Sequence, residues 1–256
     1  MYVAASLLVW TFVLVTLPIL FAGALLVFLV TYPFDRRRVL LHLYSCLWAS
    51  LYVWTNPLWR CRVVGREKLP WRAPAVLVAN HASLIDILVL YGLFRPYKWV
   101  SKSENFRIPI VGWNMVLNGY VSVTRGAADS VRRMMARCLE LLAGGSPVLL
   151  FPEGTRTMTG ALQPFKDGAF RLAMQAGVPV IPIAVSGTFE ALPKHGVMLR
   201  HHMDAVVEVL DPIAPHGYES PGALRDAARS AVAAALARRA GTRAVEPAEA
   251  EQARAG

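Results

Sequence analysis

The stretch "APAVLVANHASLID", residues 73–86, joins a run of small and branched apolar residues to a polar segment that carries a histidine and an aspartate. Short apolar runs bounded by turn signals are typical of strands buried inside a parallel sheet. In open α/β sheets the ligand crevice lies beyond the carboxyl ends of the strands. The polar segment therefore marks a candidate site at the end of a buried strand.

The same alternation of short apolar runs and helical patterns continues along the chain and predicts an α/β fold. We expect a mixed, largely parallel central sheet flanked by helices. Strands are predicted at 62–64, 75–79, 98–101, 120–124, 148–151, 180–185 and 205–210. Helices are predicted at 84–94, 109–117, 129–143, 167–176 and 224–239.

A second polar segment, "FPEGTRT" at 151–157, follows another apolar run. If the two strands are parallel neighbours, both segments open onto the same edge of the sheet. Gly154 allows a tight turn whose successive N–H groups can bind an anion. Arg156 adds a planar fork of donors that matches a phosphate. For each residue alone, an ordinary turn or a surface ion pair is also credible.

His81 is the side chain best suited to accept a proton at neutral pH, and it needs a carboxylate on its far ring nitrogen to fix its tautomer. We expect Ser83 to cap a helix that begins at Leu84, which places Asp86 in the first turn, where it can fold back on the imidazole. A capped helix with a structurally satisfied histidine is an equally good reading of this heptapeptide alone.

The N-terminal residues 1–33 carry no charged side chain and are long enough to span a bilayer. Residues 39–59 are apolar, rich in Trp and Tyr, and flanked by arginines on both sides, which favours an interfacial helix; a second span is the alternative. We therefore predict a membrane anchor at 1–59, a catalytic domain at 60–240 on the cytoplasmic side of the inner (plasma) membrane, and a disordered tail at 241–256.

The net charge of +10 indicates anionic partners. An anionic membrane surface is favoured over nucleic acid, because no basic run interleaved with aromatic residues follows the anchor. Three cysteines without a CxxC spacing agree with a reducing compartment. The histidines at 195, 201 and 202, with Asp204, match no common metal-site spacing, so no metal is expected.

Four ordered blocks carry a family resemblance: "NHASLID", "GYVSVTR" at 119–125, "FPEGTRT" and "VPVIPIAVSG" at 178–187. They resemble the blocks of the glycerolipid acyltransferase family, in particular its 1-acylglycerol-3-phosphate (lysophosphatidate) acyltransferases. The likeness covers roughly residues 60–212. Four motifs in order are far more specific than a single short pattern.

The resemblance implies that His81 is the general base and Asp86 its charge partner. It implies that Arg125, Glu153, Gly154 and Arg156 bind the glycerol phosphate part of the acceptor. Thr155 completes the predicted substrate-binding set, because the backbone N–H groups of residues 153–155 are candidate donors to the oxyanion. The implied reaction moves an acyl group from an acyl thioester to the free hydroxyl of lysophosphatidate, giving phosphatidate for phospholipid biosynthesis. Acyl-coenzyme A or acyl carrier protein is the expected donor, and no cofactor is expected.

Three alternatives remain open on the sequence. The acceptor can be glycerol 3-phosphate, another lysophospholipid or a lyso-aminolipid. A lipid hydrolase would use water in place of the glycerol hydroxyl. A non-catalytic lipid-binding protein is disfavoured, because His81, Asp86, Glu153 and Arg156 are all present. The oligomeric state and the preferred acyl chain length are not predicted.

Overall fold

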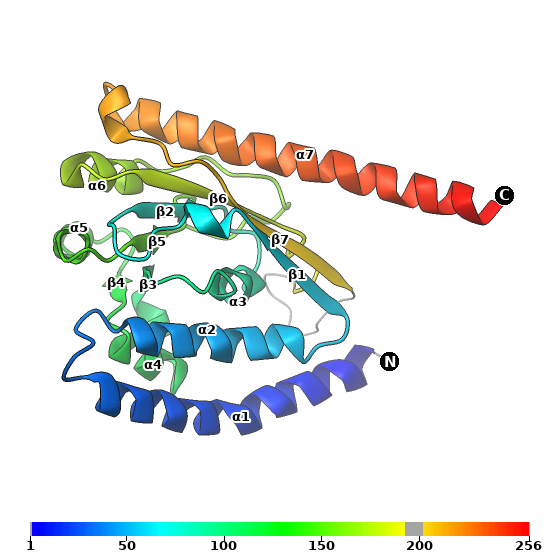
Figure 1. Cartoon of the computed structure of the whole chain (residues 1–256), viewed down its shortest axis with the longest axis horizontal. Helices are drawn as coiled ribbons and strands as arrows, with labels where there is room; N and C mark the ends of the chain where they lie inside the picture. The colour runs from blue at the N-terminus through cyan, green and yellow to red at the C-terminus, as the bar shows by residue number, and fades with distance from the viewer. Residues whose placement is uncertain (1, 193–201, 256) are drawn as a thin grey trace.

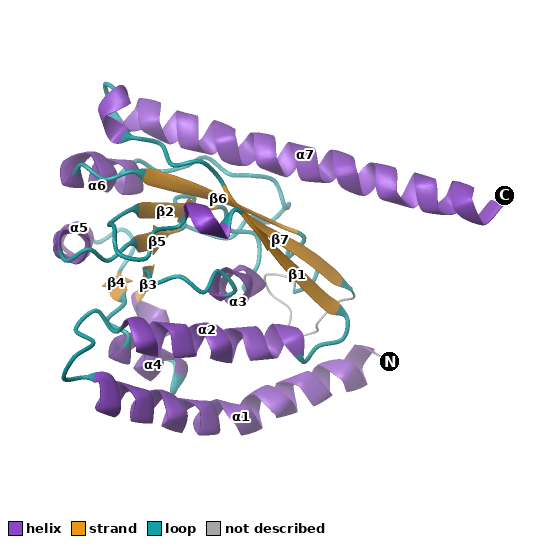
Figure 2. Cartoon of the chain, viewed as in Figure 1, coloured by secondary structure: helices purple, strands orange, loops and turns teal. Residues whose placement is uncertain are grey.

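A seven-stranded sheet forms the centre of the molecule, with helices on both of its faces (Figures 1 and 2). This computed structural model describes residues 2–192 and 202–255. The strand order is β1-β7-β6-β2-β5-β3-β4. The strands are β1 Trp59–Val64, β2 Val76–Ala79, β3 Lys98–Lys102, β4 Val121–Val123, β5 Val148–Leu150, β6 Val180–Ser186 and β7 Met203–Val209.

Every neighbouring pair of strands is parallel except β6 and β7, which are antiparallel. The mixed, largely parallel sheet predicted from the sequence is therefore confirmed. Strand β2 lies between β5 and β6. Its register with β5 pairs Val76 with Val148 and Val78 with Leu150, the last residue of β5. The carboxyl ends of β2 and β5 thus meet at one edge, as the sequence predicted.

Successive residues of β2 point to opposite faces of the sheet, which divides the core into two layers. Val76 and Val78 pack with helices α5 (Ala128–Ala143), α6 (Gly168–Ala176) and α7 (Pro221–Ala255). Leu77 and Ala79 pack on the other face with helices α2 (Val39–Trp54) and α3 (Ile85–Tyr91). A strand that is buried on both faces needs apolar residues at every position, which explains the continuous apolar run.

Helix α1 (Tyr2–Thr31) lies outside α2 and runs antiparallel to it (Figure 1). The Tyr44 hydroxyl donates to the Leu20 carbonyl, and the hydroxyls of Tyr52 and Thr16 lie 3.2 Å apart. Residues Ser6–Thr31 are long and apolar enough to cross a membrane, by length and composition only. Pro18 lies inside this helix, and Figure 1 shows α1 bending near its middle.

Helix α2 is shared between the predicted anchor and the predicted catalytic domain. Cys46, Ala49 and Val53 belong to the core formed with α3 and the sheet. The predicted boundary at residue 59 is therefore not a boundary of packing. His42 on α2 adds polar contacts to this packing. Its buried ring hydrogen-bonds the Tyr120 hydroxyl and the Arg95 carbonyl, which both lie in the predicted catalytic domain.

The remaining elements are helix α4 (Val111–Leu117) and three 3₁₀ turns at Arg66–Lys68, Ser103–Arg107 and Pro215–Gly217. Helix α7 continues to Ala255, whereas the sequence analysis predicted a disordered tail from residue 241. This segment is rich in Ala and Glu, which are strong helix formers.

Candidate active site

The polar segments after β2 and β5 meet through main-chain and side-chain hydrogen bonds. The His81 amide donates to Glu153 Oε1 at 2.6 Å, and the Thr157 amide donates to the His81 carbonyl at 3.0 Å. The two segments lie about 70 residues apart in the sequence, so the parallel pairing of β2 with β5 is what brings them together. The sheet edge predicted to hold the site therefore holds both motifs.

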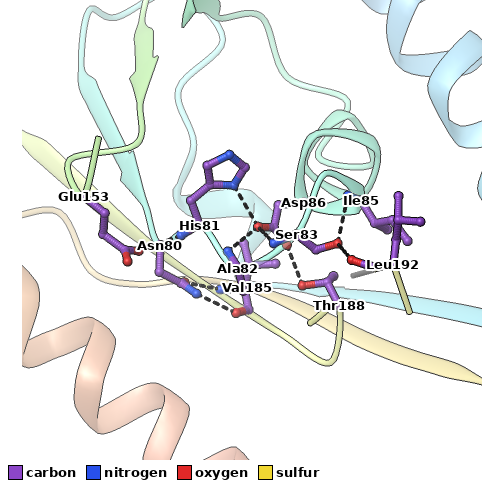
Figure 3. Close-up of polar contacts among 10 residues, drawn as sticks. All are labelled: Asn80, His81, Ala82, Ser83, Ile85, Asp86, Glu153, Val185, Thr188 and Leu192. Atoms are coloured by element: carbon purple, nitrogen blue, oxygen red, sulfur yellow. Dashed lines mark hydrogen bonds and ion pairs between the residues drawn. The ribbon is translucent and has the colours of Figure 1, made fainter. Parts of the chain in front are cut away.

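His81 and Asp86 form the contact that the sequence predicted. His81 Nδ1 lies 2.9 Å from Asp86 Oδ2, and the carboxylate is fully buried (Figure 3). The same Oδ2 accepts the amide N–H groups of Ala82 and Ser83 at 2.6 and 2.8 Å. An ionised carboxylate only accepts hydrogen bonds, so it holds the proton of His81 on Nδ1 and leaves Nε2 as the basic atom.

The helix start differs in detail from the prediction. Helix α3 begins at Ile85, its N-cap is Leu84, and no side chain caps it there. The Ser83 hydroxyl accepts the Ile85 amide at 3.3 Å and donates to the Leu192 carbonyl at 3.2 Å. Ser83 therefore ties this segment to the residues after β6 and is only a weak helix cap.

Phe151 holds the imidazole from the side of β5. Its ring stacks on the His81 ring with 3.9 Å between centroids and an interplanar angle of 10°. Trp99 on β3 packs behind Phe151, with 5.6 Å between ring centroids. The sequence analysis missed this contact, although Phe151 stands directly before the polar residues of its motif.

Glu153 is buried and binds the main chain with both oxygens. Its Oε1 accepts the His81 amide and its Oε2 accepts the Gln163 amide at 3.1 Å. Burial raises the pKa of the Glu153 carboxyl and the charge of Asp86 adds to the rise, whereas the two amide hydrogen bonds and the charge of Arg229 lower it, which leaves the pKa at about 7. These contacts fix the loop 152–163, and the substrate-binding role of Glu153 stays a prediction.

Gly154 adopts a left-handed backbone with φ of 74°, which a side chain would strain. Its amide donates to the Phe151 carbonyl at 3.0 Å and closes a tight turn. A Cβ at this position would lie 3.0 Å from Lys166 Nζ, so the lysine crosses directly over the glycine. Lys166 is an exposed cation beside the turn that the sequence analysis did not single out.

The other predicted substrate-binding residues are more peripheral. Thr155 is exposed and Arg156 is partly buried, and both follow the Gly154 turn. Arg125 is exposed in the turn after β4, which lies three strands from β2 in the sheet. At about 4.8 Å per strand this separation is roughly 14 Å, so Arg125 lies at the same edge but apart from the His81 pair.

A metal centre receives no support from the described residues, where no group of three His, Cys, Asp or Glu side chains is placed to hold an ion. His195 and His201, which the sequence analysis considered and set aside, lie outside the described residues. The chemistry that the described edge can perform is proton transfer by His81 beside a turn flanked by Arg156 and Lys166.

Comparisons with known proteins give a consistent family. The model of the protein family described as Acyltransferase matches residues 60–186. A 1-acyl-sn-glycerol-3-phosphate acyltransferase of Chlamydomonas reinhardtii is 40% identical over 229 residues, which cover 89% of this chain and 67% of that protein. The chain spans only about half of two chloroplastic plant relatives, 52% and 55% of their lengths.

Two further comparisons concern the fold and the acceptor. The crystal structure of the 1-acyl-sn-glycerophosphate (LPA) acyltransferase from Thermotoga maritima superposes with a TM-score of 0.71 at 25% identity. The superposition covers 91% of this chain and 95% of the Thermotoga maritima chain. A lyso-ornithine lipid O-acyltransferase of Pseudomonas aeruginosa is 33% identical over 171 residues, which cover 61% of this chain and 66% of that protein.

Proposed function

The chain belongs to the acyltransferase family, and from that premise we propose that it transfers a fatty acyl group from an acyl thioester to the free hydroxyl of lysophosphatidate. The product is phosphatidate, a precursor of membrane phospholipids. The observation that carries this proposal is the buried His81–Asp86 pair, which lies at one sheet edge beside the Gly154 turn and its cations.

The reaction begins with proton transfer to His81. Nε2 removes the proton of the glycerol hydroxyl while that oxygen attacks the thioester carbonyl carbon. The tetrahedral intermediate collapses, the carbon–sulfur bond breaks, and the imidazolium returns its proton to the departing thiolate. Asp86 stabilises the imidazolium between these two steps, and the stacked ring of Phe151 limits its rotation.

The phosphate of the acceptor binds at the turn after β5. Arg156 supplies a planar guanidinium for bidentate contact, and Lys166 supplies a point charge over Gly154. The backbone N–H groups around Thr155 are candidate donors to the oxyanion. Arg125, three strands away, meets the outer part of the head group or an anionic neighbour in the membrane.

A membrane-facing site suits a lipid acceptor. Leu84 stands within the first motif and Met158 directly follows the second, and these large apolar side chains are 50% and 63% exposed. Helix α1 anchors the chain in the same bilayer. We place the protein at the inner (plasma) membrane with its catalytic domain on the cytoplasmic side, where acyl-coenzyme A and acyl carrier protein are available.

A second acceptor is favoured by one observation, the similarity to a lyso-ornithine lipid O-acyltransferase. A lyso-aminolipid carries a free hydroxyl but no phosphate. The cations at 156 and 166 favour the phosphorylated acceptor, because a phosphate monoester offers up to two negative charges to the two cations, whereas the carboxylate of an ornithine lipid offers one.

The test is an acceptor series with the detergent-purified full chain and a single donor, oleoyl-coenzyme A, with products identified by mass spectrometry. Lysophosphatidate, glycerol 3-phosphate, lysophosphatidylcholine and lyso-ornithine lipid are compared with a sample that contains no acceptor. We expect phosphatidate to form at least tenfold faster than any other product. A faster reaction with the lyso-ornithine lipid would establish the second acceptor, and free fatty acid in every sample would indicate a hydrolase. Repeating the series with oleoyl-acyl carrier protein identifies the donor.

A further inference from the structure

Thr188 contacts the Asp86 carboxylate from the segment that follows β6, the strand beside β2. Thr188 is buried with 1% of its surface exposed, and its hydroxyl donates to Asp86 Oδ1 at 2.5 Å (Figure 3). The two oxygens of Asp86 therefore have different partners. Oδ2 accepts His81 Nδ1 and two amides, and Oδ1 accepts Thr188.

We infer that Thr188 is a positioning residue for the proposed acyl transfer, because it fixes the rotation of the Asp86 carboxylate and, through it, the tautomer of His81. The inference rests on the proposed function. The amides of Ala82 and Ser83 and the Thr188 hydroxyl all donate to the carboxylate, whose oxygens then face Nδ1 as acceptors and favour the tautomer with its proton on Nδ1. Without the threonine hydroxyl, Oδ1 loses its described donor in a fully buried setting, and the carboxylate is free to turn away from Nδ1.

The position of Thr188 is set by the sheet and not by chance contact of a loop. Strand β6 pairs with β2, and the Asn80 side chain extends that pairing by one step. Its amide nitrogen donates to the Val185 carbonyl at 2.9 Å, and its oxygen accepts the Val185 amide at 2.7 Å. Gly187, with φ of 81°, then turns the chain so that Thr188 reaches the carboxylate.

Ser83 offers a matched control. Its hydroxyl ties the same two segments together by donating to the Leu192 carbonyl, yet it does not touch the carboxylate. Removing the Ser83 hydroxyl therefore weakens the tether between α3 and the residues after β6 and leaves the four donors to Asp86 in place. A purely structural role for Thr188 predicts that Thr188→Val and Ser83→Ala behave alike.

The experiment measures kcat and the KM of both substrates for Thr188→Val, Thr188→Ser and Ser83→Ala, with thermal unfolding of each variant. We expect Thr188→Val to lower kcat about tenfold with both KM values unchanged, since a hydrogen bond to a charged group is lost. Thr188→Ser, which keeps the hydroxyl, stays within about threefold of the parent. Ser83→Ala keeps most of the parent kcat, even if its unfolding midpoint falls as far as that of Thr188→Val. Equal kcat for Thr188→Val and Ser83→Ala would overturn the inference.

Two further readouts separate this inference from the proposed function. In an Asp86→Asn background, adding Thr188→Val should cause no further loss of kcat, whereas losses that multiply would show that Thr188 acts independently of Asp86. ¹⁵N NMR of labelled histidine reports the His81 tautomer without any turnover. We expect Nδ1–H alone in the parent and a mixture in Thr188→Val. An unmixed tautomer in the variant contradicts the positioning role. If the parent transfers no acyl group but Thr188→Val still changes the His81 tautomer, only the proposed function is refuted.

Discussion

At the scale of single residues, the site combines one local contact with several that come from neighbouring strands. The His81–Asp86 pair spans five positions, so the sequence alone predicted it, and the structure places the atoms 2.9 Å apart. Phe151 reaches the site from the residue after β5, Thr188 from the segment after β6, and Lys166 from the segment before α6. Nothing in their own sequence neighbourhood says what they face, because strand order and register decide it.

Glu153 makes a prediction about pH and stability. Its folded-state pKa is raised from 4.5 to about 7, so the folded chain holds this proton more tightly than the unfolded chain does. The free energy of unfolding therefore falls as pH rises between these two values. Relative to Glu153→Gln, which does not titrate, the parent should lose roughly 2 kcal/mol of stability between about pH 5 and pH 8. Urea unfolding at both pH values measures this, and a constant difference would contradict the assignment.

Arg156 makes a prediction about the acceptor. Arg156→Ala should raise the KM for lysophosphatidate about 10- to 100-fold while the KM for the acyl donor stays unchanged, because a charge-assisted phosphate contact is lost. Arg132→Ala is the control, since that arginine is exposed on α5 and pairs with Asp129. Steady-state kinetics with each substrate varied in turn provides the measurement. An equal rise in both KM values would remove Arg156 from the phosphate role.

At the scale of elements, the turn between α1 and α2 is fastened to the domain by its arginines. Arg36 to Arg38 are the arginines on the N-terminal side of the apolar segment 39–59. In the structure Arg38 Nη1 donates to the Val116 and Leu117 carbonyls, at 3.0 and 2.6 Å, and so caps the C-terminus of α4. A cation at this end of a helix also complements its dipole. Arg37 Nε donates to the Ser146 hydroxyl, whereas Arg36 is exposed.

This cap predicts a difference between neighbouring arginines. Arg38→Ala should lower the free energy of unfolding by about 1–2 kcal/mol, because two C-terminal carbonyls of α4 lose their donor. Arg36→Ala should change it by less than about 0.5 kcal/mol, as exposed substitutions generally do. Denaturant unfolding in a mild detergent compares the two variants. Similar losses for both would mean that the turn acts through its charge and not through the cap.

The elements themselves were largely predictable, and the exceptions have physical reasons. All predicted strands are present, because buried strands in a parallel sheet carry apolar residues without interruption. The role of α2 was not predictable from hydropathy. Its apolar residues serve two surfaces at once, since Cys46 faces the sheet core while Leu47 is exposed. An apolar helix with protein on one side and lipid on the other has the same hydropathy as an interfacial helix, so hydropathy does not distinguish the two.

At the scale of the whole molecule, one side of the protein is apolar over three helices. Large exposed apolar side chains occur on α1, on α2 and on α4: Leu14, Ile19, Leu26, Leu40, Leu47, Val111, Trp113 and Val116. Large exposed apolar patches on a protein mark contacts with other proteins or with a membrane. The net charge of +10 favours anionic lipid, and salt screens this attraction between exposed charges but not the burial of apolar side chains.

Membrane binding should therefore resist salt. The full chain is expected to float with vesicles of phosphatidylcholine alone and of phosphatidylcholine with phosphatidylglycerol, and to stay bound at about 1 M salt, where the Debye length is only ~3 Å. Density-gradient flotation measures the bound fraction. Release from both kinds of vesicle by salt would show that charge, and not the apolar helices, holds the protein at the membrane.

The central claim, acyl transfer with His81 as the base, is tested most directly by release of free thiol from oleoyl-coenzyme A. The detergent-purified parent and His81→Ala are each assayed with and without lysophosphatidate. Transfer predicts thiol release that depends on the acceptor in the parent and falls at least about 10²-fold in the variant, while thermal unfolding stays the same. Acceptor-dependent release that persists in His81→Ala would contradict the claim, and release without acceptor would identify a thioesterase instead.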